Sequence, residues 1–159
     1  MSENVSKESI KDLEVFKGLS DDEYVLISDI CSRETFEKDA ILFNEGEFGR
    51  KLYIIEEGRL ICESEARQNN RIIVGQEGKG GICGWSAAVE PYIYTSTSRA
   101  VEKTKVIVID AARMQDICHL HSNICAVFKE CLLNTVVKRL ADLRKYVAVV
   151  MHYSQGHMD

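Results

Sequence analysis

The stretch from Gly80 to Ala100 holds the residues of this chain that are best suited to bind a small ligand. It opens in a glycine cluster, continues through a short apolar turn at 86–89 and the only proline, Pro91, and ends in an alternating segment at 94–100. Closely spaced glycines let a backbone take positive φ and approach a ligand. Successive amides in such a turn can form an anion-binding concavity. The same spacing is also typical of a tight connection between two strands that binds nothing.

The six cysteines are a second group of residues with chemical potential. None forms a CxxC pair or a zinc-finger spacing, and in a reducing compartment most are expected to be small buried side chains. Cys118, Cys125 and Cys131 lie close in sequence to His119 and His121. A metal, haem or redox site therefore competes there with plain packing at a helix–helix corner.

The composition is that of one ordinary globular domain of 159 residues, which we expect to span 1–153. The net charge of −5 argues against a nucleic-acid binder. No apolar run approaches the ~20 residues of a membrane span, and the first residues lack the apolar core of a signal peptide. We therefore expect a cytoplasmic protein without a membrane partner. No histidine or carboxylate pairs plausibly with a nucleophile, so an enzyme is the least expected class.

The elements that must position these residues follow from hydrophobic spacing. After a weakly helical N-terminal segment, Ser20 and Glu23 form a capping box that begins a helix. From 33 to 109, short strands alternate with polar turns, and Glu57-Gly58 predicts a two-residue hairpin. This pattern predicts an α+β fold built on an antiparallel double-stranded β-helix, which is a jelly-roll-like β-roll with flanking helices.

Two helices are expected after the roll. Asp110 is an N-cap for a small helix at 110–120, and a long helix follows at 122–153 before a frayed tail at 154–159. The long helix carries a heptad seam made by Leu133, Val136, Leu140, Leu143, Val147 and Val150. A helix of this length exceeds what a small roll covers, so we expect a homodimer through its distal half rather than a helix that simply lies on the roll. The flanks of the seam are expected to be solvated and carry Lys138, Arg139, Arg144 and Lys145.

This order of elements resembles the cyclic-nucleotide-binding domain, and most closely the effector domain of catabolite-activator-type bacterial regulators. The resemblance covers roughly residues 13–150. It is carried by Gly46-Glu47-Phe48-Gly49, by Leu52-Tyr53-Ile54-Ile55 with Gly58, and by Gly80-Gly81-Ile82-Cys83-Gly84 followed by Ala87, where the family's phosphate-binding cassette begins. Regulators of this type continue into a helix-turn-helix domain. Only about six residues follow Tyr153 here, so direct DNA binding is not expected of this chain.

The cassette departs from the family pattern at two charged positions. The resemblance implies a glutamate for the ribose and an arginine for the cyclic phosphate, and Trp85 and Tyr94 stand in those places. Losing a charge-assisted contact removes ~1.5–3 kcal/mol of binding free energy. Backbone amides with the Ser86 and Thr95 hydroxyls could still hold a phosphate, with Trp85 or Tyr94 stacking on a base. Alternatively, the pocket is recast for a less charged, partly aromatic ligand, or the two rings fill it.

The sequence predicts a stand-alone small-molecule-sensing regulatory module that relays ligand occupancy through its dimerising helix. A cyclic nucleotide or another small ligand is the candidate ligand, no cofactor is certain, and a protein is a second candidate partner. No catalytic or metal-binding residue is assigned. The predicted ligand-binding residues are Gly81, Cys83, Gly84, Trp85, Ser86, Ala87, Tyr94, Thr95 and Ser96. The alternatives are a ligand-free dimeric scaffold and a redox or haem sensor using Cys118, His119, His121 or Cys125.

Overall fold

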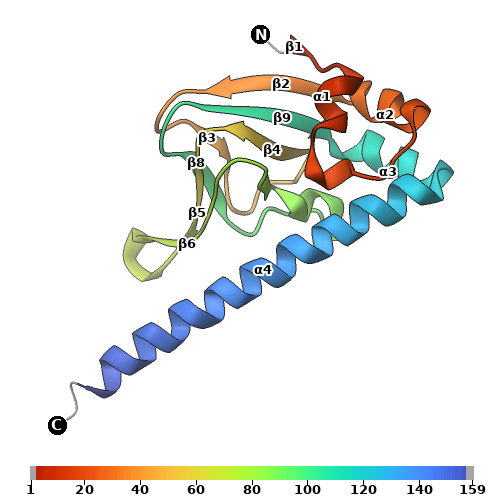
Figure 1. Ribbon diagram of the computed structural model, residues 1–159. Helices are drawn as coiled ribbons and strands as arrows, with labels where there is room; N and C mark the ends of the chain where they lie inside the picture. Colours follow the sequence, from red (N-terminus) through yellow and green to blue (C-terminus); the bar gives the residue numbers. More distant parts are fainter. Residues whose placement is uncertain (1–2, 157–159) are drawn as a thin grey trace.

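The computed structural model describes residues 3–156, which form a β-roll with helices packed at one end (Figure 1). The elements in chain order are β1 (Glu3–Asn4), α1 (Lys7–Lys11), η1 (Glu14–Phe16), α2 (Asp21–Ser28), β2 (Cys31–Phe36), β3 (Ile41–Phe43), β4 (Lys51–Glu57), β5 (Leu60–Glu65), η2 (Arg67–Asn69), β6 (Arg71–Glu77), β7 (Ile82–Cys83), η3 (Trp85–Ala88), β8 (Thr97–Ala100), β9 (Thr104–Asp110), α3 (Ala111–Leu120) and α4 (Ser122–Gln155). The predicted α+β fold class is confirmed.

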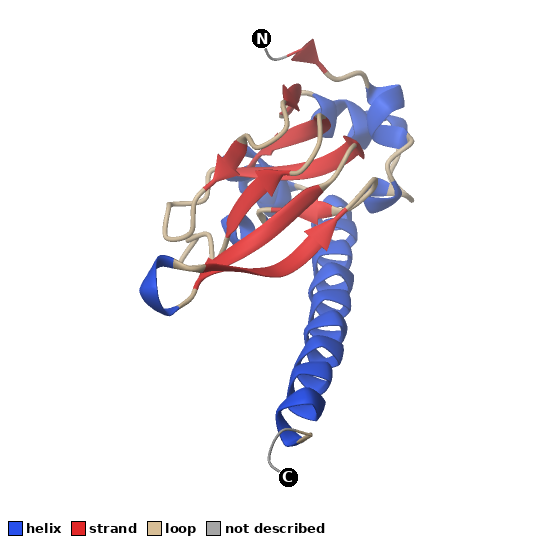
Figure 2. Ribbon diagram, turned by 90° about the vertical axis from the view of Figure 1, so that its left-hand side faces the viewer, coloured by secondary structure: helices blue, strands red, loops and turns tan. Residues whose placement is uncertain are grey.

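Two antiparallel sheets enclose the core, and Figure 2 shows their strands in red. One sheet has the strand order β1-β2-β9-β4-β7 and the other has the order β3-β8-β5-β6. Apolar side chains from both sheets meet between them, among them the fully buried Ile54, Leu60 and Ile107. Consecutive buried residues in β4 (52–55) and β9 (106–109) show that these strands are covered on both faces, since successive side chains point to opposite faces of a sheet.

The predicted hairpin at Glu57-Gly58 is wrong. β4 and β5 flank this turn, but β4 pairs with β7 and β9 while β5 pairs with β6 and β8. The turn therefore carries the chain from one sheet to the other. Gly58 has φ 93°, and a Cβ there would lie 2.5 Å from Thr104 Oγ1. The glycine is required by its positive φ and by this close approach, not by a hairpin.

The predicted helix caps are confirmed. Ser20 Oγ accepts a hydrogen bond from Glu23 N at 3.3 Å, and Glu23 Oε2 accepts one from Ser20 N at 2.8 Å. The carboxylate of Asp110 accepts a hydrogen bond from Arg113 N at 3.0 Å, which begins α3. These bonds satisfy amides that have no partner in the first helical turn.

Only the first part of α4 is anchored in the core. Ile124, Phe128 and Leu132 are buried there, and the Phe128 ring stacks on Phe16 with centroids 6.4 Å apart. The helix then continues past the roll into the open (Figure 1). It includes Ser154, and residues 157–159 of the predicted tail lie outside the described residues. Among the helices of residues 3–156, none combines the length and apolarity needed to cross a bilayer.

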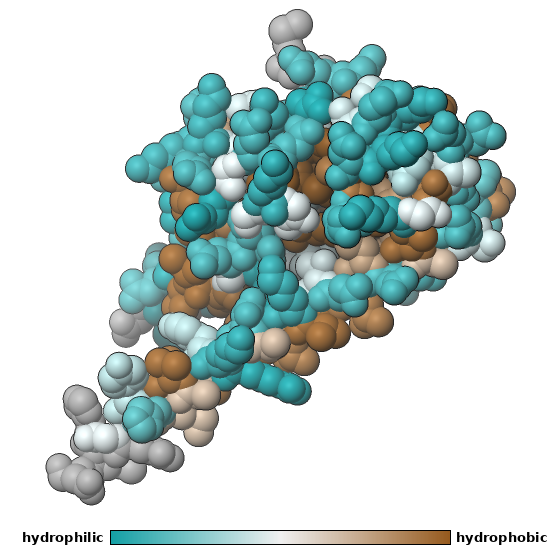
Figure 3. Space-filling view, viewed as in Figure 1, coloured by the Kyte–Doolittle hydropathy of each residue, from teal (hydrophilic) through white to brown (hydrophobic). Residues whose placement is uncertain are grey.

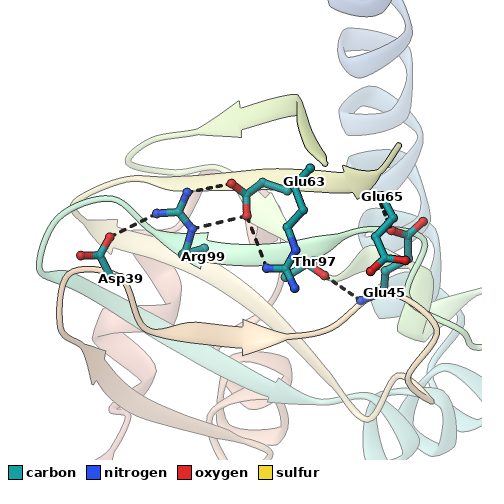
Figure 4. A network of polar contacts seen from close by, with 7 residues as sticks. Asp39, Glu45, Glu63, Glu65, Thr97 and Arg99 are labelled. Atoms are coloured by element: carbon teal, nitrogen blue, oxygen red, sulfur yellow. Dashed lines mark hydrogen bonds and ion pairs between the residues drawn. The ribbon is translucent and has the colours of Figure 1, made fainter. Parts of the chain in front are cut away.

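A partly buried network of polar contacts links strands of the smaller sheet (Figure 4). Glu63 on β5 is 7% exposed, and its carboxylate accepts hydrogen bonds from Arg99 of β8 at 2.7 and 3.3 Å. Arg99 also pairs with Asp39 at 3.2 Å. Beside them, Thr97 Oγ1 accepts a hydrogen bond from Glu45 N at 3.0 Å. The network satisfies a carboxylate that would otherwise be buried without a partner.

Replacing Arg99 by methionine is expected to lower the free energy of unfolding by about 1–3 kcal/mol, because the Glu63 carboxylate loses its main hydrogen-bond donor. Urea denaturation measures the change. Lys103→Met is the matched control, since Lys103 forms a 3.7 Å ion pair with Glu37 in which both side chains are more than 70% exposed. It is expected to change stability by less than about 0.5 kcal/mol.

The difference in the free energy of unfolding between the wild type and Arg99→Met is expected to depend on pH. The hydrogen bonds from Arg99 lower the pKa of Glu63. The pair therefore stabilises the fold above the unfolded pKa of about 4.3, and this contribution is lost as pH falls through the lower folded pKa. This difference in unfolding free energy should become smaller below about pH 4. A gap that is constant from pH 7 to pH 3 would contradict an ionic origin.

Candidate functional site

The turn that follows β7 is held close to β4 by two glycines. Gly84 has φ 74° and begins η3, with its carbonyl accepting a hydrogen bond from Ala87 N at 3.0 Å. A Cβ on Gly84 would lie 3.0 Å from Lys51 O, and one on Gly49 would lie 2.7 Å from the Ala87 Cα and Cβ. Both close approaches exclude larger residues. The backbone around η3 is therefore fixed against the wall of the roll.

A cavity of about 270 Å³ lies between this turn, the segment 94–96 and α4. Its volume is near the lower end of the range that small-molecule sites occupy. The lining is largely apolar. It is formed by Phe43, Cys62, Val74, Gly84, Trp85, Ser86, Tyr94, Thr95, Ser96, Val136, Arg139, Leu140 and Leu143.

The structure brings together six of the nine predicted ligand-binding residues around this cavity: Gly84, Trp85, Ser86, Tyr94, Thr95 and Ser96. The other three do not line it. Cys83 and Ala87 are buried in the core, and Gly81 lies against the side chain of Glu77. These three shape the surroundings of the cavity and do not face it.

Tyr94 serves as part of the wall, because its ring and its hydroxyl are both engaged by the roll. The ring stacks on Phe43 with centroids 3.9 Å apart, and the side chain is buried. Its hydroxyl donates to Lys51 O at 2.6 Å and accepts from Lys51 N at 3.2 Å. Burial raises the pKa of Tyr94, so the phenol stays neutral. The predicted strand at 94–100 begins only at Thr97, since residues 94–96 bend along the cavity.

Arg139 of α4 is the charged residue of this cavity, and its predicted place on a solvated flank is wrong. Its side chain is only 12% exposed. Nη2 donates a hydrogen bond to Cys62 Sγ at 3.3 Å, and Nε lies 3.4 Å from Glu77 Oε1. Glu77 itself is 7% exposed. The helix therefore inserts a cation into the side of the roll, where a buried carboxylate and a thiol receive it.

Two further glycines make room for this ion pair. Gly75 pairs with Cys62 across β5 and β6, and a Cβ on it would overlap Nη1 of Arg139. A Cβ on Gly81 would lie 2.6 Å from Glu77 Oε2. One member of the predicted glycine cluster therefore accommodates a carboxylate. The bare strand at Gly75 accommodates the guanidinium.

Helical spacing held a signal that pointed to Arg139. Val136, Arg139, Leu140 and Leu143 follow the steps i, i+3, i+4 and i+7, so they share one face of α4. All four line the cavity. A lone cation inside an apolar stripe indicates a buried partner, because an unpaired charge on a packed face is costly.

Comparison with known proteins identifies the family of this domain. The model of the cyclic nucleotide-binding domain matches residues 33–121, which is more than half of the chain. The chain belongs to this family. It is 29% identical over 106 residues to a cAMP-dependent protein kinase regulatory subunit from Candida albicans, covering 67% of this chain and 22% of that protein. This chain thus spans about a fifth of the length of that relative.

Two solved structures share the fold of this cyclic nucleotide-binding domain. A cyclic nucleotide-binding protein from Geobacter metallireducens superimposes with a TM-score of 0.77 at 24% identity, covering 86% of this chain and 98% of that one. A cyclic nucleotide-binding domain from Methylobacillus flagellatus gives a TM-score of 0.81 at 15% identity, covering 93% of this chain and 87% of that one. At these identities the likeness concerns the fold.

The cysteines and histidines considered for a metal, haem or redox site lie away from the cavity. Cys118, His119 and Cys125 line a separate hollow between α3 and α4. His119 Nδ1 lies 3.3 Å from Gln115 O, and burial raises the pKa of the Cys118 thiol to about 11. Within residues 3–156, the domain contains no group of three or more potential metal ligands.

Gly75→Ala is expected to destabilise the domain by about 1–3 kcal/mol, because the new methyl group and the Arg139 guanidinium cannot occupy the same space. Gly78→Ala is the matched control, since a Cβ there would meet no atom within 4 Å. Denaturant unfolding of each variant, repeated in an Arg139→Ala background, measures the coupling. The cost of Gly75→Ala should shrink in that background. An undiminished cost would contradict the steric explanation.

Proposed function

We propose that this cyclic nucleotide-binding domain is a non-enzymatic regulatory module that binds a small anionic ligand in the cavity between η3 and α4. The observation that carries the proposal is the buried guanidinium of Arg139 at the cavity wall. Arg139 is the charged residue among the described residues that line this cavity. A cyclic nucleotide is the first candidate, since its phosphate carries one negative charge and its base offers an aromatic face.

Neutral groups around the cavity complement Arg139. The hydroxyls of Ser86, Thr95 and Ser96 line the cavity and can donate hydrogen bonds to a ligand. Trp85 is half-buried and offers a ring against which a base can stack. These groups favour a ligand with one compact anionic end and one flat end.

The open volume beside Trp85 and Tyr94 favours ligand binding over the ligand-free scaffold. Both rings are packed against the roll, and about 270 Å³ of the cavity remains unfilled by side chains. The lining atoms of this open, largely apolar cavity lack packing contacts on one side. A ligand would recover those contacts.

We further infer that α4 relays occupancy to a second copy of the chain. An anion near Arg139 would compete with Glu77 and Cys62 for the guanidinium, and so favour one position of α4 over another. A ligand shifts such an equilibrium only through its different affinity for the two positions. The same helix supplies both the cation of the cavity and an exposed apolar face, so a shift of α4 would change both.

The distal part of α4 presents an apolar face. Figure 3 shows hydrophobic surface along this helix, where it leaves the roll. The exposed apolar residues there are Leu133, Val136, Val137, Leu140, Leu143, Tyr146, Val147, Val149, Val150, Met151 and Tyr153. The seam spacing of three and four residues suits a second helix of the same kind, so a two-fold homodimer is the proposed occupant.

Calorimetric titration with cyclic AMP, cyclic GMP and cyclic di-GMP tests the ligand. We expect at least one of them to bind, and Arg139→Met to weaken its affinity by roughly 10- to 100-fold, because a charge-assisted contact is lost. Arg144→Met is the control, because Arg144 is exposed on the same helix and is expected to leave affinity unchanged. No heat and no thermal stabilisation with any of the three at millimolar concentration would exclude the nucleotide proposal.

The double variant Val147→Glu/Val150→Glu tests the dimer. These residues are 52% and 49% exposed and lie outside the cavity, so the change should leave the fold intact while two charges prevent helix association. Sedimentation equilibrium is expected to show a dimer for the wild type and a monomer for the variant. A wild-type monomer at 100 µM, roughly the concentration at which a weak dimer with a micromolar dissociation constant is saturated, would contradict the proposal.

A further inference from the structure

Two hollows outside the ligand cavity share part of their lining. One, of about 560 Å³, lies between the end of α2, the start of β4 and the first turns of α3. The other, of about 700 Å³, lies between α3 and α4. Tyr92, Ala111 and Gln115 line both. The two hollows therefore form one continuous groove along α3, which we call the α3 groove.

The lining of the α3 groove is basic, although the chain as a whole has 20 basic and 25 acidic residues. Its charged side chains are the cations Arg50, Lys51, Arg113 and Lys129 and the carboxylates Asp29 and Asp110. Two other large hollows lack this excess. One is lined by three lysines and three glutamates, and the other by three cations and five carboxylates. The positive charge is therefore a local property of the α3 groove.

Most of this positive charge has no counter-charge in the protein. Lys51 pairs with Glu34 at 3.3 Å. In contrast, Arg50, Arg113 and Lys129 form no ion pair with a carboxylate of residues 3–156. Arg50 and Arg113 line the first hollow, and Lys129 lines the second. Cations that have no ion-pair partner are thus present in both parts of the groove.

Exposed apolar side chains lie beside these cations. Phe48 lines the groove and is 55% exposed, and the Arg50 guanidinium lies over its ring, 5.6 Å from the centroid. Val89, which follows η3, is 55% exposed, and Leu120, at the end of α3, is 80% exposed. Arginine and exposed aromatic or aliphatic side chains in one place are typical of surfaces that bind other proteins.

The main chain fixes the aromatic ring that both hollows share. Tyr92 has φ 60°, which is rare for a bulky residue. Gly49 N donates a hydrogen bond to Tyr92 O at 2.6 Å, and Tyr92 N donates one to Val89 O at 2.8 Å. The Tyr92 ring lies edge-on to Phe48 with centroids 6.2 Å apart. Strained residues of this kind cluster at functional sites, and this one places two aromatic rings along the groove.

We propose that the α3 groove binds an acidic segment of a partner protein, with its carboxylates at Arg50, Arg113 and Lys129 and an apolar side chain against Phe48 and Tyr92. Because the cations line both hollows, an extended chain with several carboxylates complements them. A nucleic acid fits less well, since the net charge of −5 repels a polyphosphate and the exposed apolar side chains would have no counterpart on it.

The α3 groove and the ligand cavity are separate sites on the two ends of η3. Trp85 and Ser86 line the cavity, whereas Ala87 and Ala88 line the groove. No residue lines both sites among those that the structure describes. A partner segment can therefore bind without a ligand. A ligand that displaced η3 would also move one wall of the groove.

The test selects peptides from a random dodecapeptide phage library on the full chain, then measures the affinity of the most enriched peptide by fluorescence polarisation at about 0.15 M salt, where distant charges are screened. We expect acidic sequences that contain an aromatic or aliphatic residue. Arg50→Glu/Lys129→Glu should weaken binding by about tenfold or more, because carboxylates of the peptide then meet like charges. Arg113 is kept, since its Nη1 donates a hydrogen bond to Asp29 O at 2.9 Å.

The matched control is Arg59→Glu/Arg67→Glu. Both arginines are exposed and lie outside the groove, and this variant has the same net charge as the groove variant. It should change the affinity by less than about twofold. Phe48→Ser tests the apolar contact and should weaken binding by about fivefold or more, while circular dichroism checks that each variant keeps its fold.

Failure to enrich any peptide, or enrichment of basic or uncharged ones, would overturn the proposal. An affinity that is unchanged in a folded Arg50→Glu/Lys129→Glu variant would also overturn it, as would binding that is lost instead in Arg139→Met or in Val147→Glu/Val150→Glu. Tighter binding of a thymidine dodecanucleotide than of the peptide would assign the cations to nucleic acid. The groove variant should bind cyclic nucleotides as the wild type does. Calorimetric silence with all three nucleotides would therefore refute the ligand proposal and leave the peptide result standing.

Discussion

The buried ion pair between Glu77 and Arg139 is the interaction on which the position of α4 depends. Burying two charges is costly, and the cost is repaid only where the geometry is good and the remaining donors find partners. Gly75 and Gly81 leave room for the pair, because any side chain at either position would occupy its space. Nε of Arg139 lies 3.4 Å from Glu77 Oε1 without forming a hydrogen bond, so the contact is an ion pair. Removing one member of such a pair typically costs about 3–5 kcal/mol, since the other charge stays buried. The pair therefore favours one position of α4 on the roll.

The ion pair lies between two parts of α4 that differ in burial. Ile124, Phe128 and Leu132 anchor the first part in the core, while the residues beyond Leu143, the last one that lines the cavity, are exposed and largely apolar. Arg139 lies about two turns after Leu132, at the transition between the two parts. A change in the partners of Arg139 would therefore act on α4 at the point where its packing against the roll ends. A small rotation of α4 at this point would displace the end of the helix most.

Features that depend on neighbouring residues could be predicted from the sequence. The capping box of Ser20 and the N-cap of Asp110 are local hydrogen bonds, and both are present as expected. Pairing between distant strands is different, and the Glu57-Gly58 turn joins two sheets although its residues are typical of a hairpin. Arg139 was missed for the same reason: its burial depends on Gly75 and Glu77, which are far from it in sequence. The spacing of apolar residues on α4 predicts the helix face on which Arg139 lies, but it does not predict the residues that Arg139 contacts.

The source of charge in the cavity follows from these partners. The family resemblance implies an arginine at the position of Tyr94, which would belong to the roll. Here the phenol of Tyr94 is bonded to the backbone of Lys51, and the cation comes from α4. A cation on the roll would attract a ligand whatever the position of the helix. A cation on α4 reaches the cavity only when the helix is packed against the roll, so the charge of the cavity and the docking of the helix depend on the same side chain.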